Sequence, residues 1–396
     1  MRYYQVVISV PQGMSGAGNI LIPNKGGRPG FTPVEPAGGL WSYCSLNNGA
    51  NINTISGANA AAQQVDIDIP TAALHTPKGN AYVRIWGVSL AEIAQASNLN
   101  HLNIDVYGGM SAGLPLANPA QAGVLAQGQI LRASGDWVGT SQYLGIYIAA
   151  LGSSTSSAQT TGNPPNASTT PVPATNVTPC NLTFQWKPGQ PLMPVLAQAL
   201  STAFPQYNIV GAVSPNLVWT GSASTGFFAN LEQFAQFIQQ KTLSLLQGWA
   251  PNNLAYNGVW ICLKGRTITI TDGSTQTPPK KINFQDLVGQ PSWNGPASIQ
   301  VCTVMRGDID PGDYVTLPET IFSTGQASSS QSAGIYNGLK LSSVFQGSFL
   351  VKGVRHVGNS RGTAMQDWIT VLDLIAGGTP ATATVNSYPT YYKGST

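Results

Sequence analysis

The clearest structural signal in the chain lies in Ile282-Asn-Phe-Gln-Asp-Leu-Val-Gly-Gln-Pro-Ser-Trp-Asn-Gly-Pro-Ala-Ser-Ile-Gln-Val-Cys-Thr-Val-Met-Arg-Gly-Asp-Ile-Asp-Pro-Gly-Asp-Tyr-Val-Thr-Leu-Pro318. Residues 299–305 alternate between the two faces of an expected strand, with the two-residue period of a half-buried strand. A second expected strand covers 314–317. The Asp-Pro-Gly-Asp at 310–313 predicts a type II turn, since Pro favours its second position and Gly its third. The stretch is architectural rather than catalytic.

Composition limits what the chain can be. Its 396 residues suffice for two or three domains. Only 8% are charged, against about 25% in ordinary soluble domains. Two explanations remain open, a surface largely hidden in an assembly or a secreted β-protein covered with hydroxyl and amide groups. A net charge of +3 is too small for a dedicated nucleic-acid surface.

The first 150 residues predict about six strands and one short helix. The helix starts at a Ser89 cap, and Glu92 three residues later completes a capping box. Without a βαβ alternation, a mostly antiparallel barrel or sandwich is expected. The Gly- and Asn-rich residues 11–63 are read either as an arm that lies on a neighbouring subunit or as a segment with short strands. The strands are expected at 2–10, 64–69, 82–86, 101–106, 123–132 and 143–151.

Residues 152–178 contain Ser, Thr, Pro, Asn and Ala with almost no apolar side chain, which predicts a linker or long exposed loop. Next we expect an α+β module: a strand at 182–186, helices at 192–203 and from 228 to about 241, and a hairpin of 259–263 with 267–271. The β pattern then returns, with strands expected at 284–288, 299–305, 314–317, 336–341, 344–357 and 368–375 and a flexible loop at 323–332. The predicted domains are 1–151, a linker at 152–179, the α+β module at 180–275 and a second β domain at 276–396.

The two β segments share a short motif. Residues 125–131 and 344–350 both read hydrophobic-x-Gln-Gly-x-hydrophobic-Leu, and a last apolar strand follows each. An internal duplication would place two copies of one barrel in the chain, and coincidence is the alternative.

Candidate catalytic groups are few. A nucleophile triad would need one of three histidines, His75, His101 or His356, near a Ser or Cys and an acid. His75 is expected in a surface loop and His101 at the start of a strand, while His356 is expected to hydrogen-bond at a subunit contact. Carboxylate pairs for glycoside hydrolysis could come from two places, which are Asp66 with Asp68, and Asp308 with Asp310 and Asp313.

These carboxylates have simpler explanations. The first pair is expected on the solvated face of a strand and the second group flanks a turn, where Asp is favoured. The spacing of the second group also differs from a calcium-binding EF-hand loop. Arg306-Gly307-Asp308 forms an adhesion-like triplet that chance explains. We therefore predict no catalytic, cofactor-binding or metal-ligating residues, and no enzymatic activity.

Cysteine and tryptophan add little chemistry. Cys44, Cys180, Cys262 and Cys302 lack the spacing of a zinc site, and no disulfide is required. The nine tryptophans are spread along the chain and are expected to be core or interface anchors.

Three sets of motifs resemble the baseplate hub proteins of tailed bacteriophages. The first is Phe-Gln-Asp-Leu-Val-Gly-Gln-Pro at 284–291 with Met-Arg-Gly-Asp-Ile-Asp-Pro-Gly-Asp at 305–313. The second is 345–361 followed by 367–372, and the third is 107–116 with 127–130. The resemblance implies two antiparallel barrels similar to tail-tube protein, plus the α+β module, in a mainly β chain.

Further expectations follow from that resemblance. Three chains would form a homotrimer with six barrels in a ring, which joins a sixfold tail tube to a threefold central spike. Partners would be the tube protein, the spike, other baseplate proteins, and DNA or a tape-measure protein that passes through the lumen without specific binding.

The expected location is the virion tail. The short apolar run at the N-terminus is unlike a signal peptide, so we expect assembly in the host cytoplasm and no membrane insertion. The alternative from another class is a secreted carbohydrate-binding or glycan-hydrolysing β-protein.

Overall fold

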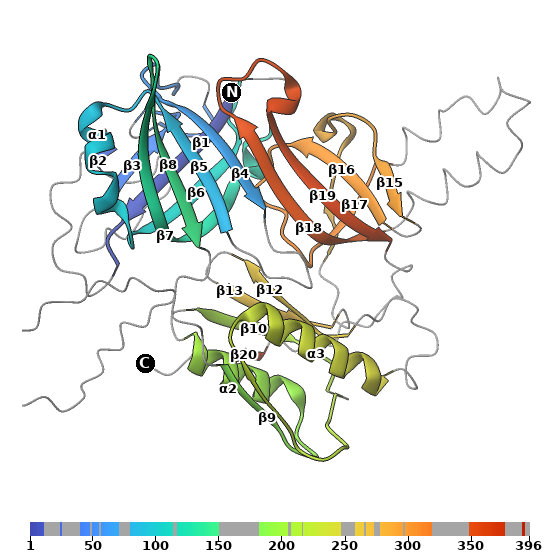
Figure 1. Ribbon diagram of the computed structural model, residues 1–396. Helices are drawn as coiled ribbons and strands as arrows, with labels where there is room; N and C mark the ends of the chain where they lie inside the picture. The colour runs from blue at the N-terminus through green and yellow to red at the C-terminus, as the bar shows by residue number, and fades with distance from the viewer. Residues whose placement is uncertain are drawn as a thin grey trace, which may run out of the picture.

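A computed structural model shows a mainly β protein with three parts (Figure 1). The N-terminal β half comprises β1–β8, the C-terminal β half comprises β14–β19, and an α+β module lies beneath both. The two β halves share one 14-stranded sheet. The structure describes residues 1–11, 24–25, 40–47, 50–54, 57–70, 80–113, 117–149, 182–204, 207–215, 217–246, 258–264, 267–272, 278–295, 298–318, 348–376 and 390–392.

The N-terminal β half is antiparallel throughout and follows the order β4-β5-β8-β7-β6-β1-β3-β2. Every strand expected in this region is present, and β7 continues well beyond residue 132. β2 and β3 lie within the predicted arm and pair with the chain's own β1 through β3, so the description of this segment as containing short strands holds for its described part. The strands are β1 (Arg2–Ser9), β2 (Asn24–Lys25), β3 (Leu40–Cys44), β4 (Gln64–Pro70), β5 (Asn80–Trp86), β6 (Asn103–Met110), β7 (Gly123–Val138) and β8 (Ser141–Ala149).

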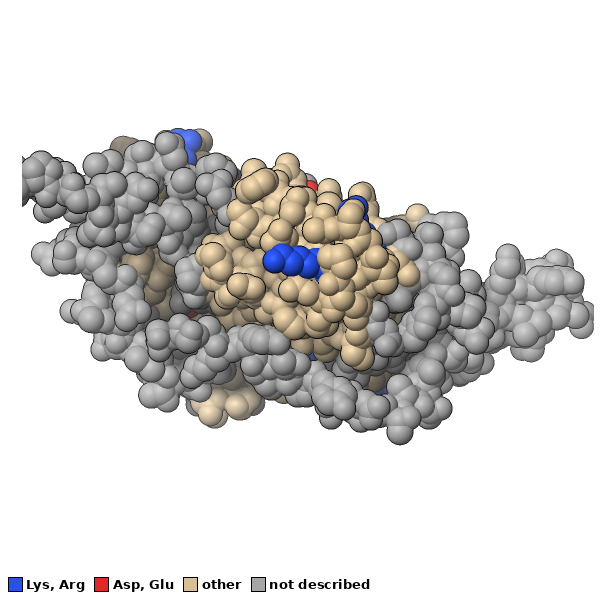
Figure 2. Space-filling view, turned by 90° about the horizontal axis from the view of Figure 1, so that it is seen from below, with Lys and Arg blue, Asp and Glu red and all other residues tan. Residues whose placement is uncertain are grey.

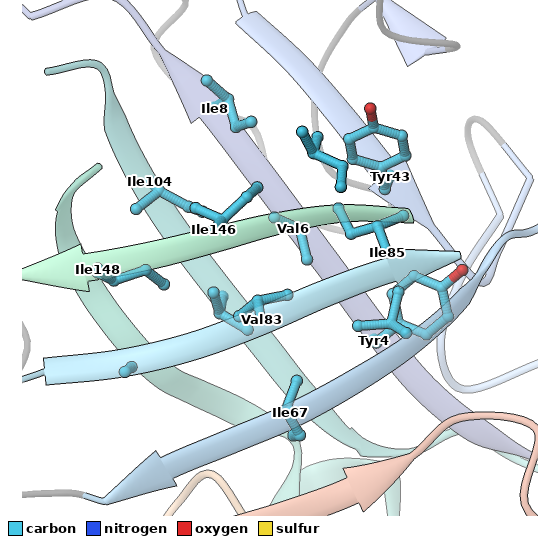
Figure 3. Packing of buried hydrophobic residues seen from close by; sticks show 14 of the residues in the cluster. Tyr4, Val6, Ile8, Tyr43, Ile67, Val83, Ile85, Ile104, Ile146 and Ile148 are labelled. Carbon is cyan, nitrogen blue, oxygen red and sulfur yellow. The ribbon is translucent and has the colours of Figure 1, made fainter. Parts of the chain in front are cut away.

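Alternation along these strands builds the core of the N-terminal half. In β4, Val65, Ile67 and Ile69 are buried while the residues between them are partly exposed. Their side chains meet those of β1, β5, β6 and β8 in one cluster (Figure 3). Each fully buried Val or Ile contributes about 1.5–3 kcal/mol by leaving water, so this cluster holds the β sheet curved around it.

The predicted capping box at Ser89 is confirmed at the start of α1 (Leu90–Ala94). The Ser89 hydroxyl accepts from the Glu92 N–H at 3.2 Å, and the Glu92 carboxylate accepts from the Ser89 N–H at 2.6 Å. The buried Tyr43 hydroxyl on β3 donates to the same carboxylate at 3.0 Å. Burial and the Glu92 charge raise the pKa of Tyr43, so the phenol stays protonated and fixes α1 against the sheet. The 3-10 helices η1 (Ala96–Leu99) and η2 (Pro119–Gln121) flank β6.

The α+β module packs two helices on two small sheets. α2 (Leu192–Ala203) agrees with the expected helix, whereas α3 (Leu231–Leu246) begins and ends later than expected because Phe228 belongs to a strand. The expected hairpin is β12 (Trp260–Lys264) with β13 (Thr267–Thr271), and β13 also pairs in parallel with β10. The module's remaining strands are β9 (Leu182–Trp186), β10 (Asn208–Ala212), β11 (Ser224–Phe228) and β20 (Thr390–Tyr392).

β20 comes from the end of the chain, yet it pairs with β10 of the module. Residues 390–392, which the prediction places in the second β domain at 276–396, therefore belong to the module's sheet.

The described residues of the C-terminal β half form six strands and a second buried cluster. One expected strand is wrong: residues 284–288 start with the 3-10 helix η3 (Phe284–Asp286), because the Asp286 carboxylate accepts from the Asn283 N–H at 2.9 Å and stabilises the start of a helical turn. The elements are β14 (Lys280–Lys281), β15 (Ser292–Gly295), β16 (Ser298–Val304), β17 (Tyr314–Thr316), β18 (Ser348–Asn359), η4 (Met365–Asp367) and β19 (Trp368–Ala376).

The expected turn at residues 310–313 is present. Gly312 has a φ of 88° and the Asp313 N–H donates to the Asp310 carbonyl at 3.1 Å, as in a type II turn. The strands on either side do not form a hairpin, since β16 pairs with β15 and β19 while β17 pairs with β14 and β18.

Some expectations lie outside the described residues, namely the linker at 152–179, the loop at 323–332 and the strand at 336–341. Figure 2 views the molecule from the side of the module and shows few charged residues on the described surface, as the composition predicts. In the described part of the chain no helix has the length and apolar content that a membrane crossing requires.

Candidate functional site

The junction between the two β halves is the most elaborate site in the described residues. β18 pairs antiparallel with β4, and the register runs from Arg355 opposite Pro70 to Asn359 opposite Asp66. Ser360 extends the ladder, because its N–H donates to the Val65 carbonyl at 2.8 Å and its hydroxyl accepts from the Val65 N–H at 2.9 Å. The edge strand of one half is therefore covered by a strand of the other, which protects both from unwanted pairing.

Trp368 of the C-terminal half enters the core of the N-terminal half. Its side chain is 2% exposed and belongs to the same cluster as Val65 and Ile67. The indole Nε1–H donates to the Gly109 carbonyl at 2.9 Å. Met305, also fully buried, joins this cluster, so the two halves interlock through side chains as well as backbone.

Arg2 closes the junction from the N-terminal side. Its guanidinium donates to the carbonyls of Asn359 (2.7 Å), Gly362 and Ala364. Asn359 is the last residue of β18, and Gly362 and Ala364 lie between β18 and η4. A single side chain from β1 thus binds three carbonyls between the end of β18 and η4.

A buried ionic cluster lies on the other side of the junction. Arg306, 3% exposed, contacts Asp286 at 3.3 Å and forms a two-bonded pair with Asp308 at 2.9 and 2.8 Å. Gln121 of the N-terminal half donates to Asp286 at 3.1 Å. The Asn283 N–H donates to the same carboxylate at 2.9 Å, so one fully buried Asp links η3, Arg306 and the opposite half.

Two glycines let the halves approach closely beside this cluster. A Cβ on Gly123 would lie 2.3 Å from the Gly307 carbonyl oxygen, and a Cβ on Gly307 would lie 2.6–2.7 Å from Gly123 backbone atoms. The Gly307 N–H donates to the Gln121 carbonyl at 2.9 Å. Any side chain at either position would force the backbones apart.

His356 is buried in β18, opposite Ile69 of β4. Its Nδ1 lies 2.9 Å from the Thr370 hydroxyl. Burial lowers the pKa of His356 to about 3, because the low-dielectric interior disfavours the charged ring. The expected hydrogen bond exists, but with the chain's own β19 and at the junction of its two halves.

The carboxylates considered for catalysis have structural partners. Asp66 accepts from the Trp86 indole at 2.6 Å, and Asp68 forms a two-bonded ion pair with Arg355 at 2.9 and 2.8 Å. That pair is about half exposed, so it adds at most about 1 kcal/mol.

The second carboxylate group is also explained by its turn and its neighbours. Asp308 binds Arg306, and Asp313 accepts from the Asp310 N–H and from Lys280, both at 2.8 Å. The Arg-Gly-Asp triplet has its Arg buried in the ionic cluster. Within the described residues no group of His, Cys, Asp and Glu could hold a metal ion.

The remaining candidates carry no chemistry that the described residues reveal. His101 is partly exposed at a left-handed φ of 68°, whereas His75 and Cys180 lie outside the described residues. Cys44 and Cys262 are buried and Cys302 is half-buried. Most tryptophans whose side chains are described are buried or partly buried, and Trp137 is the one with more than half its surface exposed.

The sequence contains two Gly-x-Ser-x-Gly pentapeptides, at 109–113 and 358–362, which have the pattern of a nucleophile elbow. Their serines are tied to backbone: Ser111 donates to the Met1 carbonyl at 3.1 Å, and Ser360 binds Val65 as described above. Both serines therefore serve the strand network.

Arg2, Gln121 and Asp286 were also missed. Only Asp286 had a sequence signal, the Asn-x-x-Asp spacing of a cap. Contacts across more than a hundred residues leave no local pattern.

The two β halves have the same strand order. The N-terminal half reads β5-β8-β7-β6 and the C-terminal half reads β16-β19-β18-β17. Each has an extra strand beyond the first, β4 and β15 respectively, and all these neighbours are antiparallel. A bulge interrupts β7 between Ile130 and Arg132 and β18 between Val351 and Gly353. If the two bulges are aligned, Ile130 is equivalent to Val351. This alignment differs by two residues from the one that the shared motif suggests.

Comparisons with known proteins give distant likenesses. No family model and no curated protein matches the chain. Among solved structures, the 43 kDa tail protein of prophage MuSo2 from Shewanella oneidensis is 8% identical, with 79% of this chain and 92% of that chain covered and a TM-score of 0.41. The tail protein from Neisseria meningitidis MC58 is 12% identical, with 79% and 91% covered and a TM-score of 0.42.

A third structure, the lidless PdpA-VgrG complex, is 7% identical, covers 99% of this chain and 67% of that chain, and has a TM-score of 0.41. At these scores the likenesses do not assign the chain to a family.

Proposed function

We propose that the protein is a structural component of a bacteriophage tail, the baseplate hub that joins the sixfold tail tube to the threefold central spike. The observation that carries the proposal is the pairing of β4 with β18 between two β halves of the same strand order. The motifs at 284–291, 305–313 and 345–361, which resemble hub proteins, support the same assignment.

Symmetry gives this arrangement its use. A chain with two equivalent β halves presents six such units when three copies form a closed ring. The ring then offers six similar surfaces to a tube, while the two halves still differ enough to meet a threefold spike. The proposed division of the chain is a tube-like barrel at 1–151, a linker at 152–179, the α+β module at 180–275 and a second tube-like barrel at 276–396, with β20 returning to the module.

The surface suits an assembly protein. With 8% charged residues and a net charge of +3, a lumen formed by this chain would let DNA or a tape-measure protein pass without specific binding. The module contacts the C-terminal half through Trp260, Cys262, Tyr314 and Leu350, which fixes it on one side of the ring. In this proposal the protein is a non-enzymatic part of the virion, assembled in the host cytoplasm.

Native mass measurement with electron microscopy tests the proposal. The expected result is a trimer, or assembly into rings on addition of tube and spike proteins. A species that stays monomeric at micromolar concentration and ignores both partners would contradict it. Release of reducing sugar from cell-wall or capsule glycans would contradict the non-enzymatic role.

A further inference from the structure

In the part of the chain that the structure describes, no strand covers the outer edge of β7 where its counterpart β18 pairs with β4. The bulges equate Ile130 with Val351, so Gly135 corresponds to His356 and Trp137 to Gly358. In β18 these positions lie opposite Ile69 and Ile67 of β4. In β7 the N-terminal part pairs with β6 as far as Gln129, and among the described residues no strand pairs with this edge beyond that point.

Hydrogen bonds show which backbone groups face outward. The Ile130 N–H and carbonyl pair with Leu102 and His101 at 2.8 Å, and the Ala133 N–H donates to the Asn100 side chain at 2.8 Å. Every second residue after Ala133 faces the same way. The N–H and carbonyl of Gly135 and Trp137 therefore point away from β8, and no described residue pairs with them there.

Apolar exposure gathers on this same hairpin. Seven large hydrophobic side chains are exposed among those described, and four of them lie on β7 or β8, namely Leu131 (45%), Trp137 (63%), Val138 (66%) and Tyr147 (47%). A fifth, Leu90, lies on α1, which packs on these strands. A strand edge with unpaired backbone groups and exposed apolar neighbours favours pairing with a strand of another chain.

β15 is the strand that fits this edge. β15 pairs with β16 in the C-terminal half, just as β4 pairs with β5 in the N-terminal half. In this correspondence Ser292, which lies opposite Gln300, takes the place of Asp68, which lies opposite Tyr82. β15 also ends the 14-stranded sheet, so its second edge is open among the described residues. Phe284, in the nearby η3, is 65% exposed. β7 and β15 lie on opposite sides of the molecule (Figure 1), so one chain cannot join them.

We propose that β7 of one copy pairs antiparallel with β15 of the next copy, in the register of β18 with β4. Asp136 then lies opposite Ser292, as Val357 lies opposite Asp68, and Gly135 lies opposite Trp293. Each chain offers one β7 edge and one β15 edge, so the contact is head-to-tail, and such contacts give a closed ring when the rotation between copies closes. The closure of the ring and the number of copies in it rest on the proposed function.

Cysteine cross-linking tests the register. Asp136 and Ser292 would form a non-hydrogen-bonded pair with Cα atoms about 4.5 Å apart, within disulfide range. The double variant Asp136→Cys with Ser292→Cys should give covalent closed rings under mild oxidation. A mixture of the two single variants should give dimers only, and either single variant alone should give no ring.

A second set of variants tests the edge without cysteine. Trp137→Pro removes the N–H that points away from β8. Trp137 lies opposite Gln142 of β8 in a pair that does not need this N–H for a hydrogen bond, so the β7–β8 hairpin should persist. Sedimentation should show association weakened about tenfold or more. Phe227→Ser is the matched control, since Phe227 is 85% exposed on β11 of the module, and it should leave association unchanged.

The outcomes separate this contact from the proposed function. Rings that form with neither cross-linking nor sensitivity to Trp137→Pro would overturn the β7–β15 contact and leave the hub proposal standing. Cross-linked rings of a number other than three would support the contact and contradict the trimer. A wild-type chain that stays monomeric even when concentrated, and that yields no cross-link, would overturn both.

Discussion

Acid should weaken the junction of the two β halves through His356. The ring is buried with a pKa of about 3, whereas in the unfolded chain the pKa returns to its ordinary 6.5. Between pH 3 and pH 6.5 the His356 ring is protonated in the unfolded chain but not in the folded chain, so the free energy of unfolding rises with pH. The contribution of His356 is fully present above pH 6.5 and is lost as the pH falls towards 3.

The magnitude follows from the unfolded pKa alone, as long as the folded pKa lies well below 5. Moving from pH 7.5 to pH 5.0 should lower the free energy of unfolding by about 2 kcal/mol through this one residue. His356→Leu removes the titrating ring at similar bulk. The Thr370 hydroxyl keeps the Arg306 N–H at 2.9 Å as a partner, so the substitution leaves no orphaned group there.

Urea unfolding at the two pH values provides the assay, and the quantity compared is the pH-dependent change in each protein. His356→Leu should lose about 2 kcal/mol less than the wild type over this interval. His101→Asn is the control, because Asn tolerates the left-handed backbone at that position and the buried ring remains; it should keep the full dependence. Equal pH dependence in wild type and His356→Leu would refute the reasoning.

Three further changes probe the same junction, each read by urea unfolding. Arg306→Met should cost about 3–5 kcal/mol because it leaves the Asp286 carboxylate buried without its cation, whereas Asp286→Asn should cost less because Arg306 keeps a second carboxylate; equal costs would contradict this account. Trp368→Ala should cost about 3–5 kcal/mol by emptying its place in the N-terminal core, and a loss below 1 kcal/mol would show that the halves do not interlock there. Gly123→Ala should cost about 1–3 kcal/mol because its methyl would meet the Gly307 carbonyl, and a neutral result would mean that the halves can separate freely at this point.

Local patterns predicted most elements of the fold. Strict alternation at Val65, Ile67 and Ile69 marks β4, and the spacing from Ser89 to Glu92 marks α1. Such patterns involve only residues that are close together in the sequence, so they can be recognised without knowing the fold. The wrong strand at 284–288 shows the limit, since the apolar Phe284, Leu287 and Val288 suggest a strand, whereas the Asp286 carboxylate, which accepts from the Asn283 N–H, favours a helical turn.

The candidate site could not be predicted in the same way. Arg2 contacts residues more than 350 positions away, and β4 pairs with a strand nearly 300 positions away. Neither contact requires a fixed spacing between residues, so neither leaves a recognisable pattern in the sequence. The strands β10 (Asn-Ile-Val-Gly-Ala) and β11 (Ser-Thr-Gly-Phe-Phe) were missed for a related reason, because such short segments gain strand structure only from the partners they meet.

The possible duplication shows how a weak sequence signal can point in the right direction and still be misaligned. The shared motif pairs Leu131 with Leu350, whereas the bulges place Ile130 against Val351. The two alignments differ by two residues, which keeps each side chain on its face of the sheet but moves it along the strand. Only the alignment based on the bulges places Gly135 and Trp137 where β18 meets β4. The stretch 282–318 then matters less for its turn than for β15, the open edge that a second copy would use.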